Sequence, residues 1–122
     1  ISANNGSVVR NCVVSGGAKA GVRVAGWSSA EGNFVQSSAI GIAITTFSSG
    51  PMRCRALDNH VTNCATGIKA TGTASFIARN TVALASTAPY DIPAGNTVGE
   101  ILNATAGANL TAATGPWANF VI

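Results

Sequence analysis

The stretch "NHVTNCATGI", residues 59–68, contains two short phrases that recur along the chain. The first is Asn-x-Val, which begins at Asn11, Asn33, Asn59 and Asn80 with spacings of 22, 26 and 21 residues. The second is a Gly or Pro followed by a large apolar residue, which falls at Val22, Ile42, Ile68 and Tyr90 with spacings of 20, 26 and 22 residues. Two independent markers with nearly the same period indicate a solenoid.

The composition of the repeating units favours strands over helices. Charged residues make up only 9% of the 122 residues, against about 25% in typical soluble domains. Val, Ile and Thr are common, and Gly, Ser and Asn separate the apolar pieces, as expected for short strands and bends. Only four leucines are present, which excludes leucine-rich repeats. The sequence therefore predicts an all-β fold, a right-handed single-stranded parallel β-helix of four to five coils of about 20–26 residues.

Stacked coils lie about 4.8 Å apart, so equivalent residues form columns. We interpret Asn11, Asn33, Asn59 and Asn80 as an internal ladder that hydrogen-bonds along the stack, rather than as ligand-binding residues. Four columns are predicted to face inward: Val13, Val35, Val61 and Val82; Val22, Ile42, Ile68 and Tyr90; Val24, Ile44, Ala70 and Ile92; and, three residues before each asparagine, Val8, Ala30, Ala56 and Ile77. The glycines beside the Val and Ile markers are expected to allow tight bends.

The phrases "GSVVRNCVVSG" (6–16) and "NHVTNCATGIKATG" (59–72) resemble coils of the right-handed parallel β-helix repeat proteins. This broad group includes pectate-lyase-like and periplasmic copper-maturation-like β-helices. The segments "YDIPAGNTVGEI" (90–101) and "GPWANF" (115–120) look like the closing segment of many bacterial members. The resemblance implies the fold but no particular activity, because this scaffold carries lyases, hydrolases, adhesins and inert stalks alike.

The chain is expected to divide into β-helix coils at 1–99 and a C-terminal strand and capping tail at 100–122. The segment "SSGPMR", residues 48–53, lengthens one repeat and is predicted to form a protruding loop. A solenoid needs caps at its ends, and Trp117, Phe120 and Val121 are suited to cover the last coil. The first coil is preceded only by "ISANNG".

The chain has only four acidic residues, so few carboxyl groups could act in catalysis. The best catalytic candidates are Asp58, His60 and Arg79 on one wall, where Asp-x-His across a bend could form an acid/base pair. In the alternative interpretation His60 is an exposed strand residue, and Asp58 pairs with Arg79 as Lys69 does with Asp91. We expect no catalysis by this chain.

Trp27 and Phe47 lie 20 residues apart at equivalent positions of adjacent coils. Stacked aromatic rings at a corner could bind a sugar ring, which makes them the ligand-binding candidates. The alternative is an aromatic ladder that seals the corner against the core.

Other partners receive little support from the sequence. The net charge of +3 comes from basic residues spread along the chain, which argues against nucleic-acid binding. No apolar run is long enough for a membrane span. Three cysteines and one histidine, without a Cys-x-x-Cys motif, predict small buried thiols and neither a metal site nor a cofactor.

The sequence thus predicts a structural or interaction module, the C-terminal part of a larger bacterial surface or secreted protein. A carbohydrate-binding module is the first alternative, and a polysaccharide lyase or glycoside hydrolase is the second. A polysaccharide is the expected small partner. Few charges and an open first coil favour a homo-oligomer, with a trimer preferred by analogy with trimeric β-helix proteins.

Overall fold

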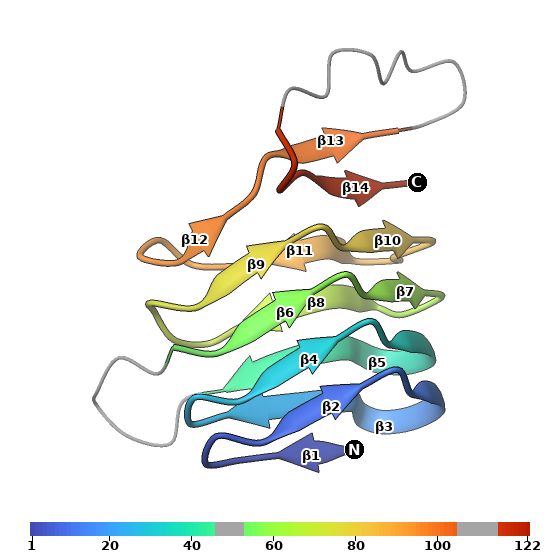
Figure 1. Ribbon diagram of the computed structural model, residues 1–122. Helices are drawn as coiled ribbons and strands as arrows, with labels where there is room; N and C mark the ends of the chain where they lie inside the picture. Colours follow the sequence, from blue (N-terminus) through green and yellow to red (C-terminus); the bar gives the residue numbers. More distant parts are fainter. Residues whose placement is uncertain (46–52, 105–114) are drawn as a thin grey trace.

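The computed structural model describes residues 1–45, 53–104 and 115–122. Within these residues no helix occurs, and short parallel strands stack as a solenoid of about five turns (Figure 1). The predicted all-β fold of stacked parallel coils is confirmed. Apart from Arg53, the loop predicted at 48–53 lies outside the described residues.

The first wall of the solenoid is a sheet of five parallel strands in the order β12-β9-β6-β4-β2. Its strands are β2 (Val8–Arg10), β4 (Ser29–Glu31), β6 (Arg55–Leu57), β9 (Phe76–Ala78) and β12 (Thr97–Val98).

The second sheet bends to form two further walls, because its long strands β3 (Val13–Ala25) and β5 (Phe34–Thr45) turn a corner. The second wall contains residues 13–15 of β3 and 34–36 of β5, then β7 (His60–Thr62), β10 (Thr81–Ala83), β14 (Asn119–Val121) and β13 (Ile101–Asn103). The third wall contains β1 (Ser2–Ala3), the second halves of β3 and β5, β8 (Thr66–Ala70) and β11 (Ala88–Asp91).

Columns of inward side chains from the three walls fill the interior. The first wall contributes Val9, Ala30, Ala56 and Ile77, and the second contributes Val14, Val35, Val61 and Val82. The third wall contributes two columns, Val22, Ile42 and Ile68, and Val24, Ile44 and Ala70. Tyr90 is paired with Ile68 and packs against this core. Burial of these apolar columns is the main force that holds the coils together.

The first coil is shifted by one residue from the predicted register. Val8 and Val13 were predicted to face inward, but they are 53% and 78% exposed. Val9 pairs with Ala30, and Val14 pairs with Val35, so these residues take the inward positions instead. The shift arises because the asparagine of this coil, Asn11, occupies the corner that precedes the ladder position.

The corners place one residue per coil in the left-handed backbone region. In the first corner these are Asn11, Gly32, Asp58 and Arg79, with φ between 54° and 61°. In the second corner they are Gly16, Ser37, Asn63 and Leu84, with φ between 52° and 73°. This conformation costs a residue with a side chain about 1–2 kcal/mol. Bulky residues such as Arg79 and Leu84 therefore adopt it because the stacked coils impose it.

The glycines beside the Ile and Val markers have a different role from the predicted one. Gly21, Gly41 and Gly67 are not among the residues with positive φ, so they are not needed for a bend. A Cβ atom built at Gly41 would overlap Cγ1 of Val61, and one at Gly67 would overlap Cγ1 of Val82. Glycine occurs here because the opposing valine column fills the space.

The C-terminal end departs from the order of the sequence. β13 follows β12 along the chain, yet it is the outermost strand of the second wall (Figure 1). β14 comes later and lies between β10 and β13, parallel to both. A segment distant in sequence therefore completes the fifth level of the wall.

Candidate functional site

The ladder consists of Asn33, Asn59, Asn80 and Asn119, and all four residues are buried. Oδ1 of Asn59, Asn80 and Asn119 each accepts two hydrogen bonds from the asparagine of the preceding coil, one from the backbone N–H and one from Nδ2. Between Asn33 and Asn59 both donor–acceptor distances are 3.0 Å. Between Asn59 and Asn80 they are 3.1 and 2.9 Å, and between Asn80 and Asn119 both are 3.0 Å.

Each Nδ2 also donates to a main-chain carbonyl of the preceding coil. The acceptors are Val9, Ala30, Ala56 and Ile77, at distances of 2.9–3.2 Å. Because a backbone N–H can bond only to an acceptor, the side-chain oxygen must point toward the preceding coil. Among the described residues, no buried side-chain nitrogen or oxygen lacks a hydrogen-bond partner. The ladder is thus a structural element with no group left to bind a ligand.

Asn11 does not belong to this ladder, contrary to the sequence prediction. It is exposed, with φ of 54°, and Cys12 occupies the ladder position of the first coil. The backbone N–H of Cys12 donates to Oδ1 of Asn33 at 3.0 Å. Asn119 is the member that the sequence analysis missed: Asn119-Phe120-Val121 is itself an Asn-x-Val phrase, but its distance of 39 residues from Asn80 breaks the period.

Asp58 and Arg79 form a two-pronged ion pair between adjacent coils. Nε of Arg79 donates to Oδ1 of Asp58 at 2.7 Å, and Nη2 donates to Oδ2 at 2.6 Å. These hydrogen bonds to Arg79 lower the pKa of Asp58 and raise that of Arg79. The carboxylate is therefore ionised at neutral pH with both oxygens occupied, which suits an ion pair and not a general acid.

His60 is not part of this pair. It lies on the second wall, after the buried Asn59, and its ring stacks on that of Phe34 with centroids 5.2 Å apart and planes 7° apart. Among the described residues no hydrogen bond or ion pair joins His60 to Asp58. The structure therefore brings two of the three catalytic candidates together and leaves the third on another wall.

Two further acidic residues are engaged in the same way. Arg10 contacts Glu31 at 2.6 Å, and Lys69 contacts Asp91 at 2.8 Å, in both cases across neighbouring coils. The hydrogen bond from Arg10, with a second from Ser29, lowers the pKa of Glu31. Within residues 1–45, 53–104 and 115–122, no cluster of three His, Cys, Asp or Glu side chains could hold a metal ion.

Of the two aromatic candidates, Trp27 is 64% exposed with φ of 68°. Phe47 lies outside the described residues, so the predicted platform rests on Trp27 alone. Trp27 stands at a left-handed corner and does not belong to the packed core.

Trp117 forms an aromatic cluster that the sequence did not reveal. It is 49% exposed, the guanidinium carbon of Arg79 lies 5.0 Å from its ring centroid, and its edge-on contact with Phe76 spans 5.7 Å. Arg79 therefore contacts Asp58 on one side and an indole on the other. This cluster depends on the path of the C-terminal segment, which the regular spacing of the repeats does not specify.

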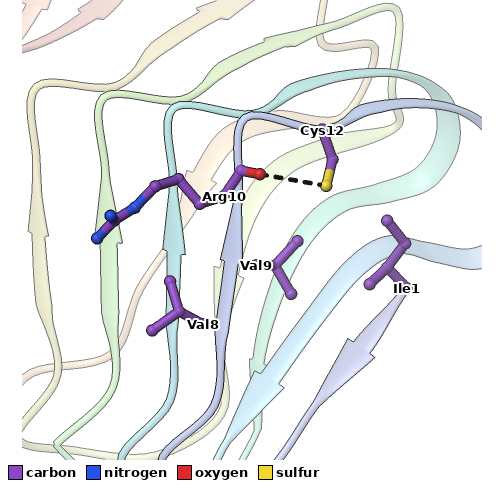
Figure 2. Close-up of a pocket in the computed structure, with 5 residues that line it drawn as sticks. All are labelled: Ile1, Val8, Val9, Arg10 and Cys12. Atoms are coloured by element: carbon purple, nitrogen blue, oxygen red, sulfur yellow. Dashed lines mark hydrogen bonds between the residues drawn. The ribbon is translucent and has the colours of Figure 1, made fainter.

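A hollow of about 430 Å³ opens at the N-terminal end (Figure 2). It is lined by Ile1, Val8, Val9, Arg10 and Cys12, and Sγ of Cys12 donates to the carbonyl of Arg10 at 3.4 Å. Its lining is apolar apart from Arg10. The hollow is the end of the core column, which no other coil of the described residues covers.

Comparison with protein-family models, with curated proteins and with solved structures gives no match to this chain. No helix in the described part of the chain is long and apolar enough to cross a membrane.

Proposed function

We propose that this chain is a structural and interaction module without catalysis of its own. The observation that carries the proposal is how its polar side chains are used. The ladder asparagines hold the coils together, and Glu31, Asp58 and Asp91 are paired with basic residues of adjacent coils. The surface that remains for partners is largely apolar or weakly polar.

The setting that we propose is a bacterial surface or secreted protein of the pectate-lyase-like β-helix group, acting as a homo-oligomer. The resemblance of residues 6–16 and 59–72 to coils of that group supports this setting. Few charges and exposed apolar side chains support self-association.

The test of this proposal is a panel of neutral and acidic polysaccharides, assayed for new reducing ends and for unsaturated sugars. We expect no turnover of any of them. Turnover that Asp58→Asn abolishes and Asp91→Asn preserves would overturn the proposal, because both changes break an ion pair but only the first alters the catalytic candidates. Light scattering coupled to size exclusion measures the oligomeric state on the same sample.

Carbohydrate binding is the second candidate function, and the cluster around Trp117 favours it. Sugar rings stack on exposed indoles, and the neighbouring Asp58 and Arg79 offer hydrogen-bonding groups. Calorimetric titration with soluble oligosaccharides would compare Trp117→Ala with Trp27→Ala. Binding lost only in Trp117→Ala would assign the site to the cluster, binding lost only in Trp27→Ala would assign it to the corner, and no binding by the wild type would contradict this function.

A further inference from the structure

The charged residues avoid one wall of the solenoid. Eleven Lys, Arg, Asp and Glu residues occur in the chain, and all fall within the described residues. The first wall and its corner carry Arg10, Glu31, Arg55, Asp58 and Arg79, and the third wall carries Arg23, Lys69 and Asp91. The strands of the second wall read Val-Val-Ser, Phe-Val-Gln, His-Val-Thr, Thr-Val-Ala, Asn-Phe-Val and Ile-Leu-Asn, without a charged residue.

The same wall exposes large apolar side chains. Val13 is 78% exposed at its first level, and Phe34 is exposed at the second, beside the stacked ring of His60. Leu84 follows the last residue of β10 at the edge of the wall and is 74% exposed. Its N–H donates to the carbonyl of Ile122, another exposed apolar residue.

Leu84 is unfavourable in the isolated chain for two reasons. Its φ of 53° lies in the left-handed region, which costs a leucine about 1–2 kcal/mol. Its side chain also gains nothing from burial. The equivalent corner residues of the preceding coils are Gly16, Ser37 and Asn63, which are glycine or small and polar. The stacked coils impose this backbone conformation, but they leave the side chain exposed, so a leucine where the equivalent residues are glycine or small and polar points to a contact outside the chain.

We propose that a second copy of this chain docks on the second wall, with Val13, Phe34 and Leu84 as its apolar contacts. This inference rests on the proposed interaction function and names its partner and its face. Two copies with a net charge of +3 repel each other, so the wall without charges is where they can approach most closely. A charged partner would instead find its complement on the first or third wall.

The size of the wall determines the strength of the contact. Three strand residues span about 10 Å, and six strands about 4.8 Å apart span about 24 Å. This footprint lies well below the roughly 800 Å² per partner of a standard interface. The pair therefore forms reversibly with rising concentration. It is a two-fold dimer and not the trimer suggested by analogy, because a three-fold ring needs two contact faces per chain.

The test is sedimentation velocity across a wide range of protein concentration. Val13→Lys places a charge on the second wall, and Val8→Lys places the same charge on the first wall of the same coil. We expect Val13→Lys and Phe34→Lys to raise the dissociation constant by about tenfold or more, since a charge buried at an interface must be desolvated. Val8→Lys should leave the dissociation constant unchanged.

Leu84→Gly separates association from folding. Glycine tolerates the left-handed corner, so this variant should melt no lower than the wild type. Its dimer should still be weakened by about tenfold, the effect of losing one buried leucine side chain.

The outcomes distinguish the inference from the proposed function. A dimer that Val8→Lys disrupts and Val13→Lys spares would overturn the inference while leaving an interaction module intact. A wild type that stays monomeric at every concentration would also overturn it, even if the wall took up a detergent micelle or another protein. Failure of the proposed function would show instead as polysaccharide turnover.

Discussion

The two ends of the asparagine ladder are built differently. At the N-terminal end Cys12 occupies the ladder position, half-buried beside an open hollow. At the C-terminal end Asn119 completes the ladder from a strand inserted out of sequence order, and Trp117 packs next to it on the outside of the first wall. Asn119 thus supplies the acceptor for the N–H groups of Asn80, whereas Cys12 contributes only a backbone donor to the ladder.

Membership of the ladder depends on the hydrogen bonds that an asparagine makes to the preceding coil and not on its spacing in the sequence. Asn119 lies 39 residues after Asn80, yet it makes the same bonds as Asn59 and Asn80 make to their own preceding coils. The comparison predicts how much a substitution at each position should change the free energy of unfolding.

The largest effect is expected in the middle of the ladder. Asn59→Ala removes both acceptor bonds from Asn33 and both donor bonds, to Ala30 and Asn80, in a fully buried site. We expect it to lower the free energy of unfolding by about 3 kcal/mol, because several buried groups lose their partners. Chemical denaturation measures this value. Asn11→Gly is the control, since Asn11 lies outside the ladder, and coincident midpoints for Asn59→Ala and the wild type would refute the ladder's role.

Asn119→Ala should cost less, about 1–2 kcal/mol, because its effect is confined to the closed end. The backbone N–H of Asn80 loses its acceptor, whereas that of Asn33 keeps Asn59. Hydrogen exchange should therefore quicken at Asn80 and stay unchanged at Asn33. Equal acceleration at both positions would contradict a local role for the inserted strand.

Trp117→Ala should cost about 1 kcal/mol, the combined value of an exposed cation–π contact with Arg79 and an edge-on contact with Phe76. Thermal unfolding followed by circular dichroism would detect the loss. Trp27→Ala is the matched control, because Trp27 lies at a strained corner outside the core. An equal loss in both variants would show that Trp117 does not secure the C-terminal end.

Each half of the solenoid has an ion pair whose carboxyl pKa is lowered, Glu31 with Arg10 and Asp58 with Arg79. A lowered folded-state pKa contributes stability above the ordinary pKa of the group, and that contribution is lost as the pH falls toward the folded-state value. The wild type should therefore lose a small part of its stability from about pH 5 downward. Melting temperatures of Asp58→Asn should fall less over this range. Parallel pH profiles for the two proteins would contradict the linkage.

The smallest effect is expected at the open end. Cys12→Asn restores the ladder residue, but no preceding coil in the described structure can donate to its Oδ1. We expect a change within about 0.5 kcal/mol, measured by denaturation. A gain comparable to the loss in Asn119→Ala would mean that another strand covers this end, and it would make the two ends equivalent.

Much of the fold could be read from the sequence because the repeat reflects real columns. Asn33, Asn59 and Asn80 and the valines two residues after them hold the predicted positions. The prediction for the first coil was wrong because asparagine suits both the left-handed corner and the ladder. Asn11 matches the phrase but occupies the corner. The role of Gly41 was also wrongly predicted as allowing a bend, because only the packed structure shows Val61 opposite it.

The candidate site was less predictable. The Asp58–Arg79 pair follows from stacking, since the two residues occupy equivalent positions of adjacent coils. His60 was grouped with them because it is near in sequence, although the corner at Asp58 places it on another wall. Trp117 and Asn119 depend on where the C-terminal segment runs. Asn119-Phe120-Val121 matches the Asn-x-Val phrase, but its distance from Asn80 does not match the period of the repeat.

The direction of the ladder has a consequence for synthesis. Every coil obtains its side-chain acceptor from the coil that follows it in the chain, so a growing polypeptide cannot complete one turn until the next has been made. We expect compaction to trail translation by one coil, and the fourth coil to wait 39 residues for Asn119. Protease digestion of chains arrested at successive lengths would reveal this delay if each coil became resistant only after the following coil had been synthesised.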